Sequence, residues 1–210
     1  STFPVSNPAT GEVIAQCAHG GGEETKAAIA AAEAALPGWS GLTAYERSEF
    51  LYRAHALMLE RSEQLARDLT LEQGKPLRAA RTEVKYAADF LIWFAEEAKR
   101  IYGQTIPSPR KDQRFLVMHQ AVGVVGAITP WNYPISMITR KLAPALAAGC
   151  TAVLKPAAET PLTAINVYQI FHDAGIPAGV VNMVTTRDAK SVADELLTNK
   201  AVAKITFTGS

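Results

Sequence analysis

Several features that assign proteins to a class at sight are scarce in this sequence. Its 210 residues contain two cysteines and four histidines, and neither set forms a disulfide framework or a metal-ligand spacing. No apolar run reaches the length of a membrane span, and no signal peptide is recognisable at Ser1. The net charge of +1 gives no electrostatic reason to bind nucleic acid or a membrane surface. We therefore expect a cytoplasmic protein, or one of the mitochondrial matrix if a transit peptide was removed.

Signatures of phosphate binding are also absent. The chain has no G-x-G-x-x-G and no P-loop. Cys17 and Cys150 have no base or basic residue next to them, so both are expected to be buried, inert thiols. What remains is an ordinary globular composition, 48% apolar and 20% charged, sufficient for one or two domains.

Residues 1–103 are predicted to form a hairpin followed by helices. Apolar and polar residues alternate around Asn7–Gly11, as in an edge hairpin. Pro37-Gly38 is expected to end the first helix, and the capping-box pair Thr43 and Glu46 opens the second. The helices are expected at residues 23–36, 43–74 and 77–101, the last with the clearest apolar period.

Residues 104–121 differ from the rest of the chain. Pro107 and Pro109 precede a charged stretch, and a strand-like run, Phe115–His119, follows. This pattern predicts a hairpin that protrudes from the body and exposes an apolar edge. Such an edge needs cover, which a partner subunit would provide.

From Val122 onwards, strand and helix patterns alternate. Strands are expected at 122–128, 151–155, 180–184 and 204–208, and helices at 135–148, 161–174 and 189–198. This alternation predicts βαβ units, and so an α/β fold whose parallel sheet carries helices on both faces. Because the last strand has no helix after it, we expect the chain to be truncated and to continue beyond Ser210.

The most informative segment is Thr129–Pro134, at the end of the first of these strands. Two prolines, two large aromatic side chains and one amide make a rigid turn, at the sheet edge where α/β proteins bind ligands. Such a turn can be purely structural. Asn132 favours function slightly, because its side-chain amide has two donors that can face a developing negative charge.

Three other features lie near the same edge. Lys155 ends the second strand, where a lysine is either the first solvated residue or a ligand for a hydroxyl or phosphate. Gly209 and Ser210 end the last strand, where backbone N–H groups can receive a phosphate, a weak signal alone. Arg140 follows Asn132 by eight residues, about two helical turns, and either is solvated with Lys141 or binds a carboxylate.

These residues resemble a known family. The chain is similar in order, over nearly its whole length, to the NAD(P)-dependent aldehyde dehydrogenases, through Pro130–Pro134, Leu142–Cys150, Lys155-Pro156, Glu159–Pro161 and Phe207–Ser210. Three further segments resemble the succinate-semialdehyde dehydrogenase branch, namely Glu72–Pro76, Trp93–Arg100 and Met137–Lys141. The resemblance implies a Rossmann-type NAD(P)-binding domain in residues 122–210, and in 104–121 a segment for assembly into a homodimer or homotetramer.

The resemblance also implies roles for individual residues. Asn132 would be the catalytic oxyanion donor, and Arg140 and Tyr133 would bind an aldehyde substrate that carries a carboxylate. The remaining roles concern the cofactor and fall on Thr129, Pro130, Trp131, Lys155, Ala158, Gly209 and Ser210. No metal, nucleic acid or membrane is implied.

Two departures from the family bear on this expectation. The catalytic cysteine and general-base glutamate of the family lie later than Ser210, so the 210 residues alone are expected to be inactive. The family often has a glutamate where Ala158 stands; its absence allows NADP and slightly favours it over NAD, although Glu159 is adjacent. Arg187 is near enough in sequence to approach a 2′-phosphate, but a solvated loop charge is the stronger interpretation.

The resemblance therefore implies oxidation of succinate semialdehyde to succinate through a cysteine thiohemiacetal. Two alternatives remain open. One is a dehydrogenase for another ω-carboxylated semialdehyde, that of glutarate or α-ketoglutarate. The other is a non-catalytic nucleotide-binding protein on the same fold, which a missing downstream cysteine would indicate.

Overall fold

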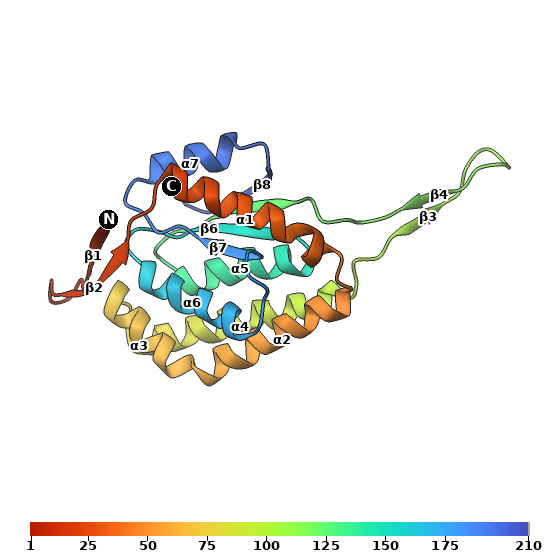
Figure 1. Cartoon of the computed structure of the whole chain (residues 1–210). Helices are drawn as coiled ribbons and strands as arrows, with labels where there is room; N and C mark the ends of the chain where they lie inside the picture. The colour runs from red at the N-terminus through yellow and green to blue at the C-terminus, as the bar shows by residue number, and fades with distance from the viewer. Residues whose placement is uncertain (210) are drawn as a thin grey trace.

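A four-stranded parallel sheet forms the centre of residues 1–209, which the computed structural model describes (Figure 1). Its strands follow the order β7-β6-β5-β8 and comprise β5 (Val124–Ile128), β6 (Thr151–Lys155), β7 (Val181–Met183) and β8 (Val202–Phe207). Every pairing in the sheet is parallel. The apolar runs of the sequence thus predicted the sheet correctly, and no strand end differs by more than two residues.

Helices cover both faces of this sheet (Figure 1). On one face lie α5 (Pro134–Ala147) and α6 (Pro161–Asp173); on the other lie α1 (Gly22–Ser40) and α7 (Ala189–Thr198). Side chains of a strand alternate between the faces: Val125 packs in the large core with α5 and α6, whereas Val124 packs in a smaller core with α1 and α7. The expected α/β class with helices on both faces is confirmed.

An outer layer of helices packs against α5 and α6. It consists of α2 (Ala44–Glu60), α3 (Ser62–Gln73) and α4 (Leu77–Ala98). The apolar period expected for α4 is confirmed at Ala80, Val84, Ala87 and Leu91, which are fully buried. The expected end at residue 101 is wrong, because the helix ends at Ala98 and Ile101 is exposed. These helices share one core with the sheet, and α4 packs against α5, the helix that follows the Asn132 turn.

Helix α1 does not end at Leu36 as the Pro37-Gly38 pair predicted. It continues through both residues to Ser40. The reason is tertiary: the Trp39 side chain is 1% exposed, and its Nε1 donates to the carbonyl of Leu146 at 3.2 Å. This buried contact stabilises a last turn that propensity alone disfavours.

The single helix expected over residues 43–74 is two helices. α2 and α3 separate at Arg61, which is the C-cap of one and the N-cap of the other. The Arg61 guanidinium lies 2.6 Å from the Asp173 carboxylate at the end of α6, so a contact distant in sequence anchors the bend. The start and the end were predicted correctly: Thr43 caps α2 through Glu46, and Gly74 closes α3 with φ of 79°.

Two antiparallel hairpins complete the chain. β1 (Thr2–Ser6) pairs with β2 (Val13–Ala18), and β3 (Gln104–Ile106) pairs with β4 (Phe115–Val117). The β3–β4 hairpin projects from the body, and all six of its strand residues are exposed (Figure 1). The protruding shape is as expected; its role in assembly, and the division into residues 1–103, 104–121 and 122–210, stay predictions.

Candidate active site

Three strand ends meet at one edge of the sheet. Thr129, directly after β5, donates its backbone N–H to the carbonyl of Lys155 at the end of β6, at 3.2 Å. On the other side, the N–H of Thr208 donates to the carbonyl of Ile128 at 3.1 Å. The structure thus brings together the ends of β5, β6 and β8, as parallel strands require. Gly209 is exposed beside them, and Ser210 lies outside the described residues.

The turn between β5 and α5 presents its side chains to solvent. Trp131 is 54% exposed and Tyr133 is 47% exposed, while Thr129 is buried beneath them at 4%. Asn132 is exposed as well, and its side-chain amide makes no hydrogen bond to any of residues 1–209. Both amide donors are therefore available to a ligand at the carboxyl end of β5.

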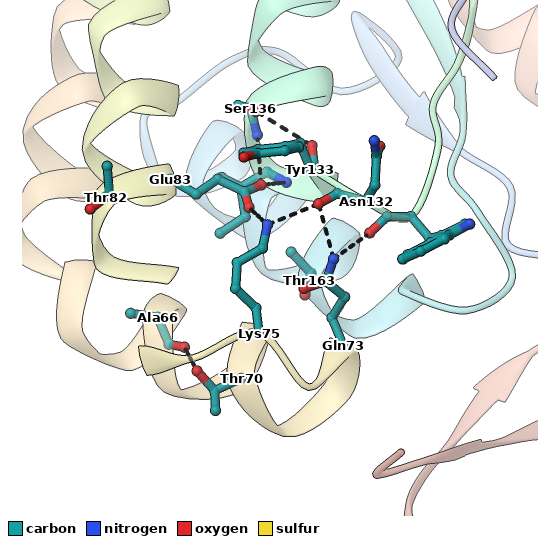
Figure 2. A network of polar contacts seen from close by, with 12 residues as sticks. Ala66, Thr70, Gln73, Lys75, Thr82, Glu83, Asn132, Tyr133, Ser136 and Thr163 are labelled. Carbon is teal, nitrogen blue, oxygen red and sulfur yellow. Dashed lines mark hydrogen bonds and ion pairs between the residues drawn. The ribbon is translucent and has the colours of Figure 1, made fainter. Parts of the chain in front are cut away.

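The last residue of α3 and the segment that leads from it to α4 bind the backbone of this turn (Figure 2). Gln73 Nε2 donates to the backbone carbonyl of Trp131 at 3.1 Å and to that of Asn132 at 2.9 Å. Lys75 Nζ donates to the same Asn132 carbonyl at 2.8 Å. Sequence reasoning missed these contacts because Lys75 and Asn132 are 57 residues apart. The only signal was the family-like segment Glu72–Pro76.

A buried glutamate from the outer helical layer caps the start of α5, and another caps the start of α6. Glu83 Oε1 accepts from the N–H groups of Ile135 and Ser136, at 3.0 and 3.4 Å, at the start of α5 (Figure 2). Glu83 also forms an ion pair with Lys75, and the Glu83 side chain is wholly buried. The carboxylate therefore satisfies donors that the first turn of a helix leaves free.

Glu72 does the same for α6. Its carboxylate accepts from the N–H of Leu162 at 2.6 Å, from the N–H of Thr163 at 2.8 Å and from the Thr163 hydroxyl. Burial raises the pKa of Glu72, although these hydrogen bonds oppose the shift. Neither glutamate was predicted to be a helix cap, because a capping residue that belongs to another helix leaves no local sequence pattern.

Arg140 and Lys141 do not form the solvated pair that the sequence suggested as one interpretation. Lys141 is 8% exposed, and its Nζ donates to the hydroxyls of Thr206 and Thr208 at 3.2 and 2.8 Å. Burial, with a smaller effect of Arg140, lowers the pKa of Lys141. Arg140 is exposed, and its guanidinium lies 5.8 Å from the ring centroid of Phe90. Only Arg140 is free to meet a solute.

A groove between α4 and α5 leads away from the turn. Its volume is about 620 Å³, and its lining includes Tyr133 and Met137 on one side and Tyr86 on the other. Tyr133, Met137 and Arg140 are spaced by four and three residues, so they share one face of α5. Tyr86 packs edge-on against Phe90 with centroids 4.9 Å apart, and this aromatic pair faces that helix surface.

On the other side of the turn lie a buried lysine and a second cavity. Lys155 is 9% exposed, its Nζ makes no hydrogen bond within residues 1–209, and burial lowers its pKa. A cavity of about 430 Å³ is lined by Trp131, Ala158, Thr160 and Arg187, among others. The hydroxyl of Thr160 is buried there without a partner in the described chain. Unpaired polar groups of this kind suit ribose hydroxyls and phosphates.

Arg187 is exposed in a loop, as the sequence favoured, but its side chain also makes contacts. Its Nη2 donates to the carbonyl of Pro4 at 3.0 Å, and its guanidinium lies 5.3 Å from the ring centroid of Phe3. The side chain therefore ties the loop before α7 to β1. It still lines the cavity that contains Ala158.

Neither cysteine is placed to act as a nucleophile. Cys17 and Cys150 are both buried, at 2% and 3% exposed. Burial, and to a smaller extent the Glu72 carboxylate, raises the pKa of the Cys17 thiol. Within residues 1–209, no group of histidine, cysteine and carboxylate side chains is arranged to hold a metal ion. No helix in that range combines the length and apolar character needed to cross a membrane.

Comparison with known proteins finds relatives that are more than half identical to this chain. The chain is 56% identical over 209 residues to a glutarate-semialdehyde dehydrogenase of Pseudomonas putida, covering 100% of this chain and 43% of that protein. It is 53% identical over 206 residues to an NADP(+) succinate-semialdehyde dehydrogenase of Escherichia coli, covering 98% and 42% of the two chains. The chain thus spans less than half the length of these relatives.

The structural comparison agrees with the sequence comparison. A crystal structure of an E. coli NADP-dependent enzyme matches with a TM-score of 0.98 at 52% identity, covering 100% of this chain and 43% of that one. The family model described as Aldehyde dehydrogenase family matches residues 1–210, the whole chain. On these grounds the chain belongs to the aldehyde dehydrogenase family.

Proposed function

We propose that the full-length protein is an NAD(P)⁺-dependent aldehyde dehydrogenase that oxidises a short semialdehyde carrying a carboxylate at its far end. The observation that carries this proposal is the free amide of Asn132 at the carboxyl end of β5, with the exposed guanidinium of Arg140 two turns along the adjoining helix. One group suits an oxyanion and the other suits a carboxylate. Relatives that act on succinate and glutarate semialdehydes support the same substrate class.

Asn132 takes the catalytic role in this proposal. When a thiolate adds to the aldehyde carbon, the carbonyl oxygen gains negative charge, and the Asn132 side-chain amide donates a hydrogen bond to it. A preorganised donor of this kind lowers the barrier because its orientation is set before the charge develops. The thiolate and the base that completes hydrolysis come from outside residues 1–209. NAD(P)⁺, when bound, accepts the hydride.

The substrate lies in the groove between α4 and α5. From Tyr133 to Arg140 the helix rises about 10 Å, and the arginine side chain reaches back over part of that length. A four- or five-carbon semialdehyde therefore fits with its aldehyde at Asn132 and its carboxylate at Arg140. The two substrates differ by one methylene, which a pocket distinguishes by only about 10- to 200-fold. We name succinate semialdehyde first, with glutarate and α-ketoglutarate semialdehydes as the alternatives.

The cofactor lies on the other side of the turn. Trp131, Thr129 and Pro130 line its nicotinamide end, and Lys155 donates to the ribose hydroxyls of the adenosine. Gly209, followed by Ser210, meets the pyrophosphate. NADP is slightly favoured over NAD because Ala158 offers no carboxylate to repel a 2′-phosphate. Glu159, next in sequence, weakens this preference.

We place the enzyme in the cytoplasm, or in the mitochondrial matrix if a transit peptide was removed. It assembles as a homodimer or homotetramer through the β3–β4 hairpin. The exposed apolar side chains of that hairpin, 45% for Phe115 and 72% for Leu116, support a partner subunit.

Substrate profiling of Arg140→Ala in the full-length protein tests the proposal. We expect kcat/KM for succinate semialdehyde to fall about 10- to 100-fold, since a charge-assisted pair is lost, with little change for uncharged butanal. Asn132→Ala should lower kcat by about 10²- to 10³-fold for both aldehydes. Arg67→Ala, an exposed arginine on α3, is the control. Unchanged turnover of succinate semialdehyde by Arg140→Ala would show that the carboxylate role is wrong.

The 210-residue chain alone should form no NAD(P)H from any of these aldehydes. Both of its thiols are buried, so no nucleophile faces Asn132 within residues 1–209. Aldehyde-dependent absorbance at 340 nm by the purified chain would refute this expectation.

A further inference from the structure

The turn that contains Asn132 depends on contacts with another part of the chain. The side-chain amide of Asn132 has no hydrogen bond within residues 1–209, so no contact of this amide fixes its orientation. The backbone, in contrast, is held at two consecutive carbonyls, those of Trp131 and Asn132. The position of the amide is therefore set through the main chain.

Lys75 is not an ordinary surface lysine. Its side chain is 11% exposed, and Nζ faces the Glu83 carboxylate, the Asn132 carbonyl and the ring of Tyr133, whose centroid is 4.0 Å away (Figure 2). Each contact takes one side of a group that has three donors and no acceptor. An ammonium with so little access to water is held by these partners in one place.

Gln73, which precedes Gly74 in sequence as Lys75 follows it, binds the same Asn132 carbonyl. Its Nε2 has two hydrogens, and the carbonyls of Trp131 and Asn132 take both. Gly74 has φ of 79°, and a Cβ there would lie 3.1 Å from Pro8 Cγ. A residue with a side chain is therefore disfavoured at position 74. The sharp bend of the backbone at Gly74 allows Gln73 and Lys75 to bind the same backbone carbonyl.

We propose that Lys75 and Gln73 are positioning residues, which fix the oxyanion-donating amide of Asn132 by binding the backbone carbonyl of the same residue. The inference rests on the proposed function. A donor misplaced by about 1 Å costs about 10²-fold in rate, so a carbonyl clamp controls catalysis without touching the substrate. Glu83 has a separate part: it neutralises Lys75 and caps α5.

Two explanations for Lys75 can be separated. If Lys75 serves only to neutralise a buried carboxylate, removing both charges restores activity. If its hydrogen bond to the Asn132 carbonyl matters, activity stays low without it. The decisive comparison is between Lys75→Met and the double variant Lys75→Met/Glu83→Gln in the full-length protein. Lys85→Met, an exposed lysine on α4, is the matched control.

We expect Lys75→Met and Gln73→Met to lower kcat 10- to 100-fold while KM for NADP changes less than twofold. The double variant should regain stability but not kcat, and Lys75→Arg should restore part of kcat because it keeps a donor. The control should behave as wild type. Recovery of kcat by the double variant, or wild-type kcat in both single variants, would overturn the inference.

Hydrogen–deuterium exchange gives a readout that needs no turnover. In the same variants, without aldehyde, amides of residues 129–137 should exchange at least tenfold faster, and the double variant should not restore them. If wild type oxidises no aldehyde, the proposed function fails, while the exchange data still decide whether the clamp exists. Unchanged exchange in this segment would show that Lys75 and Gln73 do not hold the turn.

Discussion

The starts of α5 and α6 are built alike, yet they differ in one contact. Both helices begin with a proline, Pro134 or Pro161, after a residue of nearly the same conformation: φ −138° and ψ 63° at Tyr133, φ −135° and ψ 50° at Thr160. Neither preceding residue caps its helix with a side chain. Instead a buried glutamate from the outer helical layer accepts the free N–H groups, Glu83 for α5 and Glu72 for α6.

The difference is the charge that faces each glutamate. Glu83 forms an ion pair with Lys75, whereas the polar contacts of Glu72 within residues 1–209 are backbone N–H groups and the Thr163 hydroxyl. Lys75 extends its contacts to Asn132, so the cap of α5 and the turn before it form one network. The same structural device therefore caps α6 alone, whereas at α5 it is also connected to the turn that contains Asn132.

The largest expected effect comes from removing the cap that carries the ion pair. Glu83→Ala strands a lysine that is 11% exposed and leaves two buried N–H groups unsatisfied. Breaking a buried pair from one side costs about 3–5 kcal/mol, so urea unfolding should show a loss in that range. Glu72→Ala leaves no cation behind and should cost less, about 1–3 kcal/mol.

Lys75→Met/Glu83→Gln serves as the control for this comparison. With no charge stranded, it should lose clearly less stability than Glu83→Ala. The comparison fails if Glu72→Ala destabilises the protein as much as Glu83→Ala, because the ion pair would then add nothing to the cap.

A smaller effect concerns pH and should appear at Glu72. Burial raises its pKa above the ordinary value of 4.5, so between the two pKa values the folded chain binds more protons than the unfolded chain. The contribution of Glu72 to the free energy of unfolding is therefore full below pH 4.5 and declines as pH rises through the raised pKa. Glu72→Gln should remove this decline, so its stability relative to wild type should increase with pH.

Urea unfolding of both proteins at a series of pH values checks this prediction. Glu33→Gln, an exposed glutamate on α1, is the control and should follow the wild-type profile. Parallel curves for wild type and Glu72→Gln would mean that the Glu72 pKa is not raised in the folded chain.

Local patterns predicted the sheet and the edge at which the ends of its strands meet. The strand Thr151–Lys155 and the helix Ala189–Thr198 have the bounds expected from the sequence. Because parallel strands end at one edge, Thr129, Lys155 and Gly209 could be grouped without a structure. Helical spacing also places Arg140 on the same face of α5 as Tyr133 and Met137. Arg140 itself lines a different cavity, together with Lys141 and Thr206.

Contacts between distant segments could not be predicted in this way. Glu83 caps a residue 52 positions away and Glu72 one 90 positions away, so no local pattern shows either. The bend at Arg61 and the extension of α1 to Ser40 have the same origin, a tertiary contact that overrides propensity. The side chains that hold the Asn132 turn were missed for this reason, while the catalytic role of Asn132 stays a prediction.

The smallest expected effect tests what the two helix starts share. Pro134→Ala and Pro161→Ala should each lower the free energy of unfolding by about 0.4–1 kcal/mol, because alanine leaves the unfolded chain more freedom at the first helical position. The two losses should agree within about 0.5 kcal/mol, since the preceding residues have the same conformation and both glutamates keep their hydrogen bonds. Urea unfolding of both variants measures this. If Pro134→Ala lowered the free energy of unfolding clearly more than Pro161→Ala, Pro134 would be stabilising the Asn132 turn as well as the start of α5. The starts of α5 and α6 would then differ in the role of the backbone as well as in charge.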